Sequence, residues 1–259
     1  MSAVLDRGQQ LGADDERDLF PQALRLVEEC EPVAVMLENV RGLASERFAC
    51  YREQVVARLE RLGYRVEWQV LNACEFMVPQ LRLRFILVAL VPEVARHFRR
   101  PSAKGTPSTV GEALRDLMAV GGWPGADAWA RKANGIGPTL VGGSRKHGGP
   151  DLGPTRARAA WLRLGVDGKV LAGAPPGRDH PVDHLPRLTV PMAAVIQGFP
   201  PEWRFSGGKT ASYRQVGNAF PPPVAQAVGD SIRQAIEASR SLSPVRPERF
   251  LHAVLSGLA

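Results

Sequence analysis

Two short apolar runs, separated by one helical and one alternating pattern, constrain the fold of this chain most strongly. The runs cover residues 33–37 and 85–90, and such runs are typical of strands buried on both faces of a parallel sheet. Between them, residues 48–62 place apolar side chains three or four apart, which predicts an amphipathic helix ended by Gly63. Residues 64–70 alternate apolar and polar side chains, which predicts another strand. Helices interleaved with strands indicate part of an α/β sheet.

Regular patterns continue at both ends of the chain and weaken in the middle. Residues 17–30 and 224–236 have the helical spacing of an amphipathic helix. Residues 96–186 are instead rich in Gly, Pro and Arg, and contain one short helix candidate at 110–118. This segment is expected to form a separate small domain that consists largely of loops.

The positive charge of the chain is concentrated in this middle segment. Residues 96–178 contain 14 Lys and Arg and 5 Asp and Glu, whereas the rest contains 19 and 21. Cations gathered in one segment suit a polyanion, because each neutralised phosphate releases a condensed counterion. A solvated basic loop region explains the same count, so charge alone leaves both interpretations open.

The sequence carries no signal for a membrane or for a metal site. No apolar stretch reaches the ~20 residues that span a bilayer, and residues 1–12 lack the apolar core of a signal peptide. A cytoplasmic protein is therefore expected. The three cysteines lack metal-ligand spacing, so neither a disulfide framework nor a metal site is predicted. Cys30 and Cys74 are expected to be small buried hydrophobes.

Glu38 follows the first apolar run, in the stretch Glu38-Asn39-Val40. Open parallel sheets bind ligands at the carboxyl ends of their strands. A carboxyl group there can hydrogen-bond the N3 and N4 edge of a cytosine, and burial would raise its pKa and help it donate. Capping of the next helix is the ordinary alternative for these residues.

Two further polar stretches are candidate site residues. Gln80, Arg82 and Arg84 alternate, so a strand would place all three side chains on one face. Two guanidinium groups there could hold a pyrimidine O2 and a phosphate, although a solvated edge strand shows the same pattern. Asn218 and Ala219 are predicted to form a turn entering a helix, where free N–H groups suit a ligand; a plain helix cap is the alternative.

Taken in order, these stretches resemble the DNA cytosine-5 methyltransferase family. The resemblance runs through Gly8-x-x-x-Gly12, Glu38-Asn39-Val40, Leu71-Asn72-Ala73, Gln80-x-Arg82-x-Arg84, Arg187-Leu188-Thr189, Gln197-Gly198-Phe199-Pro200 and Gln215-Val216-Gly217-Asn218-Ala219-Phe220-Pro221-Pro222. It implies an α/β fold, an incomplete Rossmann-like methyltransferase sheet plus a small, irregular target-recognition domain. The implied parts are a partial catalytic domain (1–95), the target-recognition domain (96–205), a return segment and helix packing on the catalytic domain (206–238) and a tail (239–259).

The resemblance also implies roles for the site residues. In this family a cysteine thiolate attacks C6 of a flipped cytosine, and C5 takes a methyl group from S-adenosylmethionine. Glu38 would stabilise the attacked ring and Arg84 would hold O2, with Arg82 in support. Asn218 and Ala219 would contact S-adenosylmethionine.

Double-stranded DNA is the partner that the resemblance implies. Glycine runs with interspersed cations in residues 134–149 would let the backbone approach a groove, although a surface loop explains them too. The predicted DNA-binding residues are Gln80, Arg131, Lys132, Ser144, Arg145, Lys146, Arg156 and Arg158. The tryptophans of residues 96–186, Trp123, Trp129 and Trp161, are expected to be core residues.

Two motifs of the family are absent from the sequence: the Phe-x-Gly-x-Gly-Gly cofactor loop and the Pro-Cys-Gln nucleophile loop. Pro191-Met192 also stand where an Arg-Glu pair is common in the family, so the local hydrogen bonding there is open. Three explanations fit: an enzyme split over two polypeptides, a gene start set too late, or a catalytically dead remnant. The chain alone is expected to be inactive.

The alternative functions are a DNA-binding remnant or regulatory module, and a nucleotide-binding protein that does not contact DNA. The bacterial-looking composition makes a restriction-modification system plausible.

Overall fold

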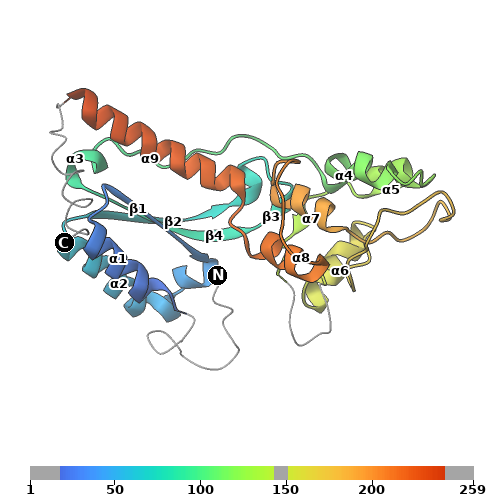
Figure 1. The fold of residues 1–259 in the computed structure, drawn as a ribbon, viewed down its shortest axis with the longest axis horizontal. Coiled ribbons are helices and arrows are strands. Elements are labelled where there is room, and N and C mark those ends of the chain that lie inside the picture. The colour runs from blue at the N-terminus through green and yellow to red at the C-terminus, as the bar shows by residue number, and fades with distance from the viewer. Residues whose placement is uncertain (1–17, 143–150, 243–259) are drawn as a thin grey trace. The chain divides into compact units, whose positions relative to one another are not determined.

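The computed structural model describes residues 18–142 and 151–242, which divide into two compact units (Figure 1). Unit 1 comprises residues 71–83 and 102–226, and unit 2 comprises the remaining described residues up to 70, 84–101 and those from 227 onward. These limits differ from the predicted domain limits at 95 and 205, because residues 71–83 and the segment up to 226 belong to unit 1. No helix in the described ranges has the length and apolarity that a membrane crossing requires.

Unit 2 is built on a three-stranded sheet. Its elements are α1 (Phe20–Cys30), β1 (Ala34–Val40), η1 (Arg41–Ala44), η2 (Glu46–Phe48), α2 (Ala49–Arg61), β2 (Arg65–Asn72), β4 (Leu83–Leu90), α3 (Pro92–Ala95) and most of α9 (Pro222–Leu242). The strand order is β1-β4-β2. Helices α1 and α2 cover one face of this sheet and α9 lies over the other (Figure 1).

The pairing of β1 corrects one expectation. β1 and β4 are antiparallel, with Ala34 opposite Leu90 and Val40 opposite Arg84. Residues 85–90 are buried on both faces as predicted, but Met36 of β1 is 39% exposed. β1 has a single strand neighbour in the described sheet, so it is an edge strand. An apolar run therefore predicted the strand correctly but neither its direction nor its burial.

Helix α2 and its connection to β2 are as the sequence predicted. α2 buries Val55 and Leu59 against α1 and the sheet, as its three-to-four spacing predicted. Gly63 has φ +91°, and the N–H of Tyr64 donates to the carbonyl of Leu59 at 3.1 Å. This left-handed residue ends the helix, because glycine adopts positive φ without a steric penalty.

Unit 1 contains more regular structure than its sequence pattern predicted. Its elements are η3 (Ala73–Glu75), β3 (Gln80–Leu81), α4 (Val110–Ala119), α5 (Ala126–Lys132), β5 (Gly137–Pro138), α6 (Thr155–Arg163), α7 (Val190–Gln197) and α8 (Lys209–Asn218). The expectation of mostly loop structure is wrong for α5 and α6. Both are short helices stabilised by tertiary packing, since Trp129 and Trp161 bury their rings in one shared core.

The tryptophans of unit 1 are core residues, as expected. Trp123, Trp129 and Trp161 are at most 5% exposed. The indole N–H of Trp129 donates to the carbonyl of Gly165 at 2.8 Å, and that of Trp123 to the carbonyl of Pro181 at 2.8 Å. The indole N–H of Trp161 is buried without a hydrogen-bond partner. Burial of all three rings in the core leaves none of these side chains free to stack on a base.

A methionine replaces the usual acidic partner at the start of α7. The Thr189 hydroxyl accepts from the N–H of Met192, and the Met192 sulfur accepts from the N–H of Thr189, both at 3.4 Å. This reciprocal arrangement has the geometry of a capping box. Met192 is fully buried, so a weak sulfur acceptor satisfies the helix start without bringing a carboxylate into the core.

Candidate active site

Glu38 and Arg84 form an ion pair in unit 2. Glu38 lies on β1, two residues before Val40, and Val40 pairs with Arg84 of β4. This diagonal register places the two side chains on one face of the sheet. The Arg84 Nε donates to Glu38 Oε1 at 2.8 Å, and the two side chains are 10% and 24% exposed. The sheet itself therefore builds the pair before any ligand binds.

Burial has the largest effect on the pKa of Arg84. Desolvation lowers the pKa of Arg84, while the charge of Glu38 and the hydrogen bond to it act in the opposite direction. Arginine still stays protonated, because its ordinary pKa exceeds 12. A carboxylate and a guanidinium held side by side can together bind a neutral ring that offers both a donor and an acceptor edge.

Arg82, two residues earlier, has a different environment in unit 1. Its side chain is fully buried. Nη1 donates to the carbonyl of Leu140 at 2.6 Å, and Nη2 donates to the carbonyls of Gly217 and Ala219 at 2.8 and 3.0 Å. The last two residues flank Asn218. The guanidinium therefore holds the backbone on both sides of this predicted cofactor contact.

Gln80 and Gln197 complete the network around Arg82. The Gln80 amide N–H donates to Gln197 Oε1 at 2.7 Å, and its oxygen accepts from the N–H of Leu140 at 2.8 Å. The Gln197 amide donates to the carbonyl of Ala219 at 2.6 Å. Both glutamines are fully buried. A buried, connected network of this kind fixes the relative positions of the segments that it joins.

The backbone around Asn218 packs tightly against residue 142. A Cβ on Gly142 would lie 2.3 Å from Asn218 Oδ1, and a Cβ on Gly217 would lie 2.6 Å from the backbone nitrogen of Gly142. Only glycine permits this approach. The chain entering the basic, glycine-rich segment therefore touches the residue that the sequence assigned to the cofactor.

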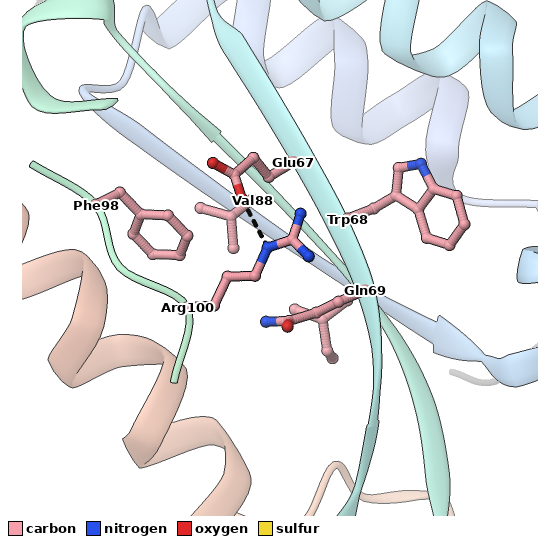
Figure 2. A pocket seen from close by; sticks show the side chains of 7 residues that line it. Glu67, Trp68, Gln69, Val88, Phe98 and Arg100 are labelled. Carbon is pink, nitrogen blue, oxygen red and sulfur yellow. Dashed lines mark hydrogen bonds and ion pairs between the residues drawn. The ribbon is translucent and has the colours of Figure 1, made fainter. Parts of the chain in front are cut away.

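Each unit has a hollow at its surface. Glu67, Gln69, Val88 and Phe98 line one hollow in unit 2, which Arg100 closes through an ion pair with Glu67 at 2.8 Å (Figure 2). Trp68 points to the other side of its strand in this view. That hollow has no room for a water-sized group. An open pocket of about 500 Å³ lies beside α4 and α5, with Arg115, Asp127 and Arg131 in its lining.

Known proteins share the ordered motifs of this chain. The chain matches the family described as C-5 cytosine-specific DNA methylase over residues 6–135 and 156–234. The chain belongs to the C-5 cytosine-specific DNA methylase family. S-adenosylmethionine is the methyl donor that this family implies.

Several relatives of this methylase-family chain are Type II methyltransferases. M.NaeI of Lentzea aerocolonigenes is 56% identical over 230 residues, covering 88% of this chain and 56% of M.NaeI. M.NgoMIV of Neisseria gonorrhoeae is 46% identical over 235 residues, covering 89% of this chain and 73% of M.NgoMIV. The chain thus spans little more than half the length of M.NaeI.

Solved structures share the fold. The Entamoeba histolytica methyltransferase EhMeth aligns with a TM-score of 0.54 at 14% identity, covering 86% of this chain and 71% of EhMeth. The S. pombe Dnmt2 methyltransferase aligns with a TM-score of 0.51 at 15% identity, covering 87% of this chain and 76% of Dnmt2. These neighbours support the α/β, Rossmann-like class of this methylase-family chain.

The structure brings some predicted site residues together and places others differently. Glu38 and Arg84 meet, whereas Arg82 and Gln80 lie inside unit 1 with their side chains bonded to protein groups. This favours structural roles for Arg82 and Gln80. Their predicted contacts with the substrate and DNA stay predictions.

Asn218 does not enter a helix, as the sequence had suggested, but ends one. α8 runs from Lys209 to Asn218, and Ala219 follows as its C-terminal cap. The cause is local: the N–H of Ala219 donates back to the carbonyl of Gln215 at 3.1 Å. A helix C-terminus presents carbonyls, and these attract the Arg82 cation.

A cofactor contact by Asn218 remains compatible with this geometry. Asn218 is exposed, and its side-chain amide makes no hydrogen bond to another described residue. The carbonyl of Ala219 already accepts from Arg82 and Gln197. The residues present therefore fit one polar contact to S-adenosylmethionine, made by the Asn218 side chain.

Gln80 is fully buried, whereas the predicted DNA-binding cations of the described segments lie at or near the surface of unit 1. Arg131 and Lys132 are exposed at the end of α5, and Arg156 is exposed in the first turn of α6. Arg158 is half-buried and reaches Thr155 Oγ1 at 3.4 Å. None of these four cations forms an ion pair with a described residue. Ser144, Arg145 and Lys146 lie outside the described residues.

Sequence reasoning missed Gln197 and misjudged two cysteines. Gln197 belongs to the Gln197-Gly198-Phe199-Pro200 motif, so the signal was present, but its link to Gln80 depends on contacts 117 residues apart. Cys30 is exposed and Cys74 is half-buried, so the expectation of two buried hydrophobes is wrong. Burial and the nearby charge of Glu75 raise the pKa of Cys74, which makes it a poor nucleophile. Residues 18–142 and 151–242 contain no cluster of three or more metal-ligand side chains.

Proposed function

We propose that this chain is the base-binding and DNA-recognition part of a DNA cytosine-5 methyltransferase. The Glu38–Arg84 pair carries the proposal. A cytosine presents O2 as an acceptor and the N4 amine as a donor, and N3 lies between them. An arginine beside a carboxyl group matches this edge, with Arg84 at O2 and Glu38 at N3 and N4.

The residues of this chain would assist the reaction at the ring. S-adenosylmethionine supplies the methyl group. When a thiolate adds to C6, electron density moves onto the ring and toward N3, where Glu38, in its protonated form, would donate a hydrogen bond from its carboxyl O–H. Loss of the C5 proton and departure of the thiolate then restore the aromatic ring. Glu38 and Arg84 hold the ring in place through these steps.

The thiol would come from outside this sequence. The sequence contains no Pro-Cys dipeptide, and the cysteines it does contain lie in other sequence contexts than that of the nucleophile loop. The proposed source is a second polypeptide that carries the cofactor loop and the catalytic cysteine. The cytoplasm, where bacterial DNA lies, is the proposed location.

The test uses purified chain, labelled S-adenosylmethionine and duplex DNA. The chain alone should give no methyl transfer above background. Transfer should appear when the unmatched remainder of M.NaeI is co-expressed, and Glu38→Gln should lower its rate by about 10²–10⁴-fold. Arg65→Ala, which removes an exposed cation of β2, is the control and should leave the rate unchanged. Turnover by the chain alone, or full activity of Glu38→Gln in the complex, would contradict the proposal.

A DNA-binding module without catalytic activity is the second candidate. The exposed cations of unit 1 favour it, because Arg131, Lys132 and Arg156 have no acidic partner among the described residues. Salt-dependent duplex binding that is retained, together with no turnover in any complex, would identify this function. Each of these residues that contacts phosphate should add about one to the salt slope.

A further inference from the structure

Arg52 of α2 is half-buried and forms no ion pair with a described residue. Its guanidinium group contacts the segment that follows Glu38-Asn39-Val40 and the ring of Trp68 on β2. We infer that Arg52 is a positioning residue for the proposed reaction, because it holds the carboxyl end of β1 where Glu38 meets Arg84. This inference rests on the proposed function and deepens it, since it names a residue that acts on the base-binding pair through the backbone.

Two backbone carbonyls beyond β1 accept hydrogen bonds from Arg52. Its Nη1 lies 2.8 Å from the carbonyl oxygen of Leu43 and 3.3 Å from that of Ser45. Leu43 lies in η1, and Ser45 is the C-terminal cap of η1. Because Nη1 carries two hydrogens, it can donate to both carbonyls at once. The guanidinium group therefore ties α2 to the turn that follows β1.

The ring of Trp68 supports the guanidinium group from β2. The Arg52 Cζ lies 4.7 Å from the centroid of the Trp68 ring, which is within the range of a cation–π contact. Trp68 in turn stacks on Phe85 of β4, with ring centroids 5.3 Å apart and ring planes inclined by 28°. A planar guanidinium group that stacks on a fixed ring loses rotational freedom. Its N–H groups therefore stay directed at the two carbonyls.

The carboxyl end of β1 depends on this turn. The ladder with β4 ends at Val40, opposite Arg84, and η1 begins at the next residue. The N–H of Val40 donates to Oδ1 of its own neighbour, Asn39, at 2.7 Å. Beyond Val40, the chain is held by the buried side chain of Leu43 and by the two hydrogen bonds from Arg52. A movement of this turn would therefore be passed to the end of β1, two residues from Glu38.

Arg52 and Glu38 act from opposite faces of the sheet. Phe85 and Arg84 are consecutive residues of β4, so their side chains point to opposite faces. Trp68 stacks on Phe85 on the face that α1 and α2 cover (Figure 1), whereas Glu38 pairs with Arg84 on the other face. Arg52 can therefore influence the ion pair only by fixing the strand to which Glu38 belongs.

The expected effect follows from the precision that a catalytic group requires. Such groups must be held within about 0.5 Å of their productive geometry, and a misplacement of about 1 Å can cost about 10²-fold in rate. Arg52→Ala removes two hydrogen bonds and a cation–π contact at a half-buried site, so the strand end should loosen while the core stays folded. We expect a loss of about tenfold in kcat. The KM for S-adenosylmethionine should change by less than about threefold, because the predicted cofactor contacts belong to unit 1.

The first test observes the ion pair in the chain alone and needs no turnover. With isotope-labelled arginine, the NMR signal of the Arg84 Nε–H is assigned by its loss in Arg84→Ala. Arg52→Ala should move this signal toward its position in Glu38→Gln, because the carboxylate shifts away from Nε. Arg61→Ala is the matched control: Arg61 is an exposed cation of the same helix, its Nε donates to the carbonyl of Ala57 within that helix, and its loss should leave the signal unchanged.

The second test measures whether Arg52 acts through Glu38. It uses the methyl-transferring complex of this chain with the unmatched remainder of M.NaeI. Arg52→Ala should lower kcat by about tenfold when Glu38 is present and by less than about threefold in the Glu38→Gln background, since coupled residues are not additive. Arg52→Lys keeps a cation beside Trp68 and should recover part of the loss. Arg61→Ala should leave kcat unchanged.

The outcomes of the two tests are separable. An unmoved Arg84 signal in Arg52→Ala, or equal losses of kcat with and without Glu38, would overturn the inference. A displaced signal together with no methyl transfer by any wild-type complex would contradict the proposed function and leave the positioning of Glu38 by Arg52 supported. If circular dichroism shows Arg52→Ala to be unfolded, Arg52→Gln replaces it in both tests, because glutamine keeps part of the stem and one amide donor group.

Discussion

Arg82 in unit 1 and Arg84 in unit 2 are two residues apart in the chain, but the two units use them differently. Arg84 faces a carboxylate and keeps 10% of its side chain exposed, whereas Arg82 is fully buried and donates to backbone carbonyls. A guanidinium beside a partly exposed carboxylate can still meet a ligand. A guanidinium group that is surrounded by backbone carbonyls instead holds the backbone in position. Two arginines of one motif can therefore have different roles. The degree of burial and the type of partner, carboxylate or carbonyl, distinguish the two roles.

The largest effect should follow from Arg82→Ala. It leaves the carbonyls of Leu140, Gly217 and Ala219 without this donor inside unit 1. Removing one side of such a buried charged network costs about 3–5 kcal/mol in the free energy of unfolding. Urea unfolding followed by tryptophan fluorescence would measure it, because Trp123, Trp129 and Trp161 all lie in unit 1. Arg82→Lys, which keeps the charge, should lose less; equal stability of Arg82→Ala and wild type would refute the anchoring role.

Arg84→Ala should have a smaller effect on stability and a larger one on activity. Glu38 loses the ion pair with Arg84 but is 24% exposed, so water can solvate part of its charge. We expect a loss of about 1–3 kcal/mol. Arg65→Ala is the control, expected within about 0.5 kcal/mol of the wild type. If Arg84→Ala destabilised the protein more than Arg82→Ala, the contrast between the two arginines would be wrong.

The partly exposed ion pair between Arg187 and Asp167 should make the smallest contribution to stability. Arg187 Nε lies 2.8 Å from Asp167 Oδ2. Partial burial raises the pKa of Asp167, but the hydrogen bonds from Arg187 and from the backbone N–H of Lys169 outweigh it, and the net pKa is lowered. Its contribution to stability is therefore present above the unfolded pKa of Asp, about 3.9, and is lost as pH falls through the folded pKa.

Asp167→Asn should remove this pH-dependent contribution, which we expect to be about 1 kcal/mol for a pair whose arginine is solvent-exposed. Unfolding measured between about pH 2 and pH 6 should show a shallower acid loss in the variant than in the wild type. Asp183→Asn, at an exposed site without an ion pair to a described residue, is the control. An unchanged pH profile in Asp167→Asn would show that the pair contributes nothing to stability.

Residue types and their spacing were sufficient to predict the local elements and the family. The three-to-four spacing of Val55 and Leu59 gave α2, Gly63 gave its end, and the run 85–90 gave β4, because periodicity and backbone preference act over a few residues. The ordered motifs identified the methylase family from residue types and order alone, and the Glu38–Arg84 candidates came with them.

The tertiary structure alone decided which motif residues are buried and which edges are open. Arg82 meets Leu140 and Gly217, which are 58 and 135 residues away, and no local pattern encodes such contacts. The same holds for the antiparallel pairing of β1, the position of Asn218 at a helix end and the burial of α5 and α6. Each depends on packing between distant segments, where desolvation and hydrogen-bond partners set the role of a side chain that the sequence can only name.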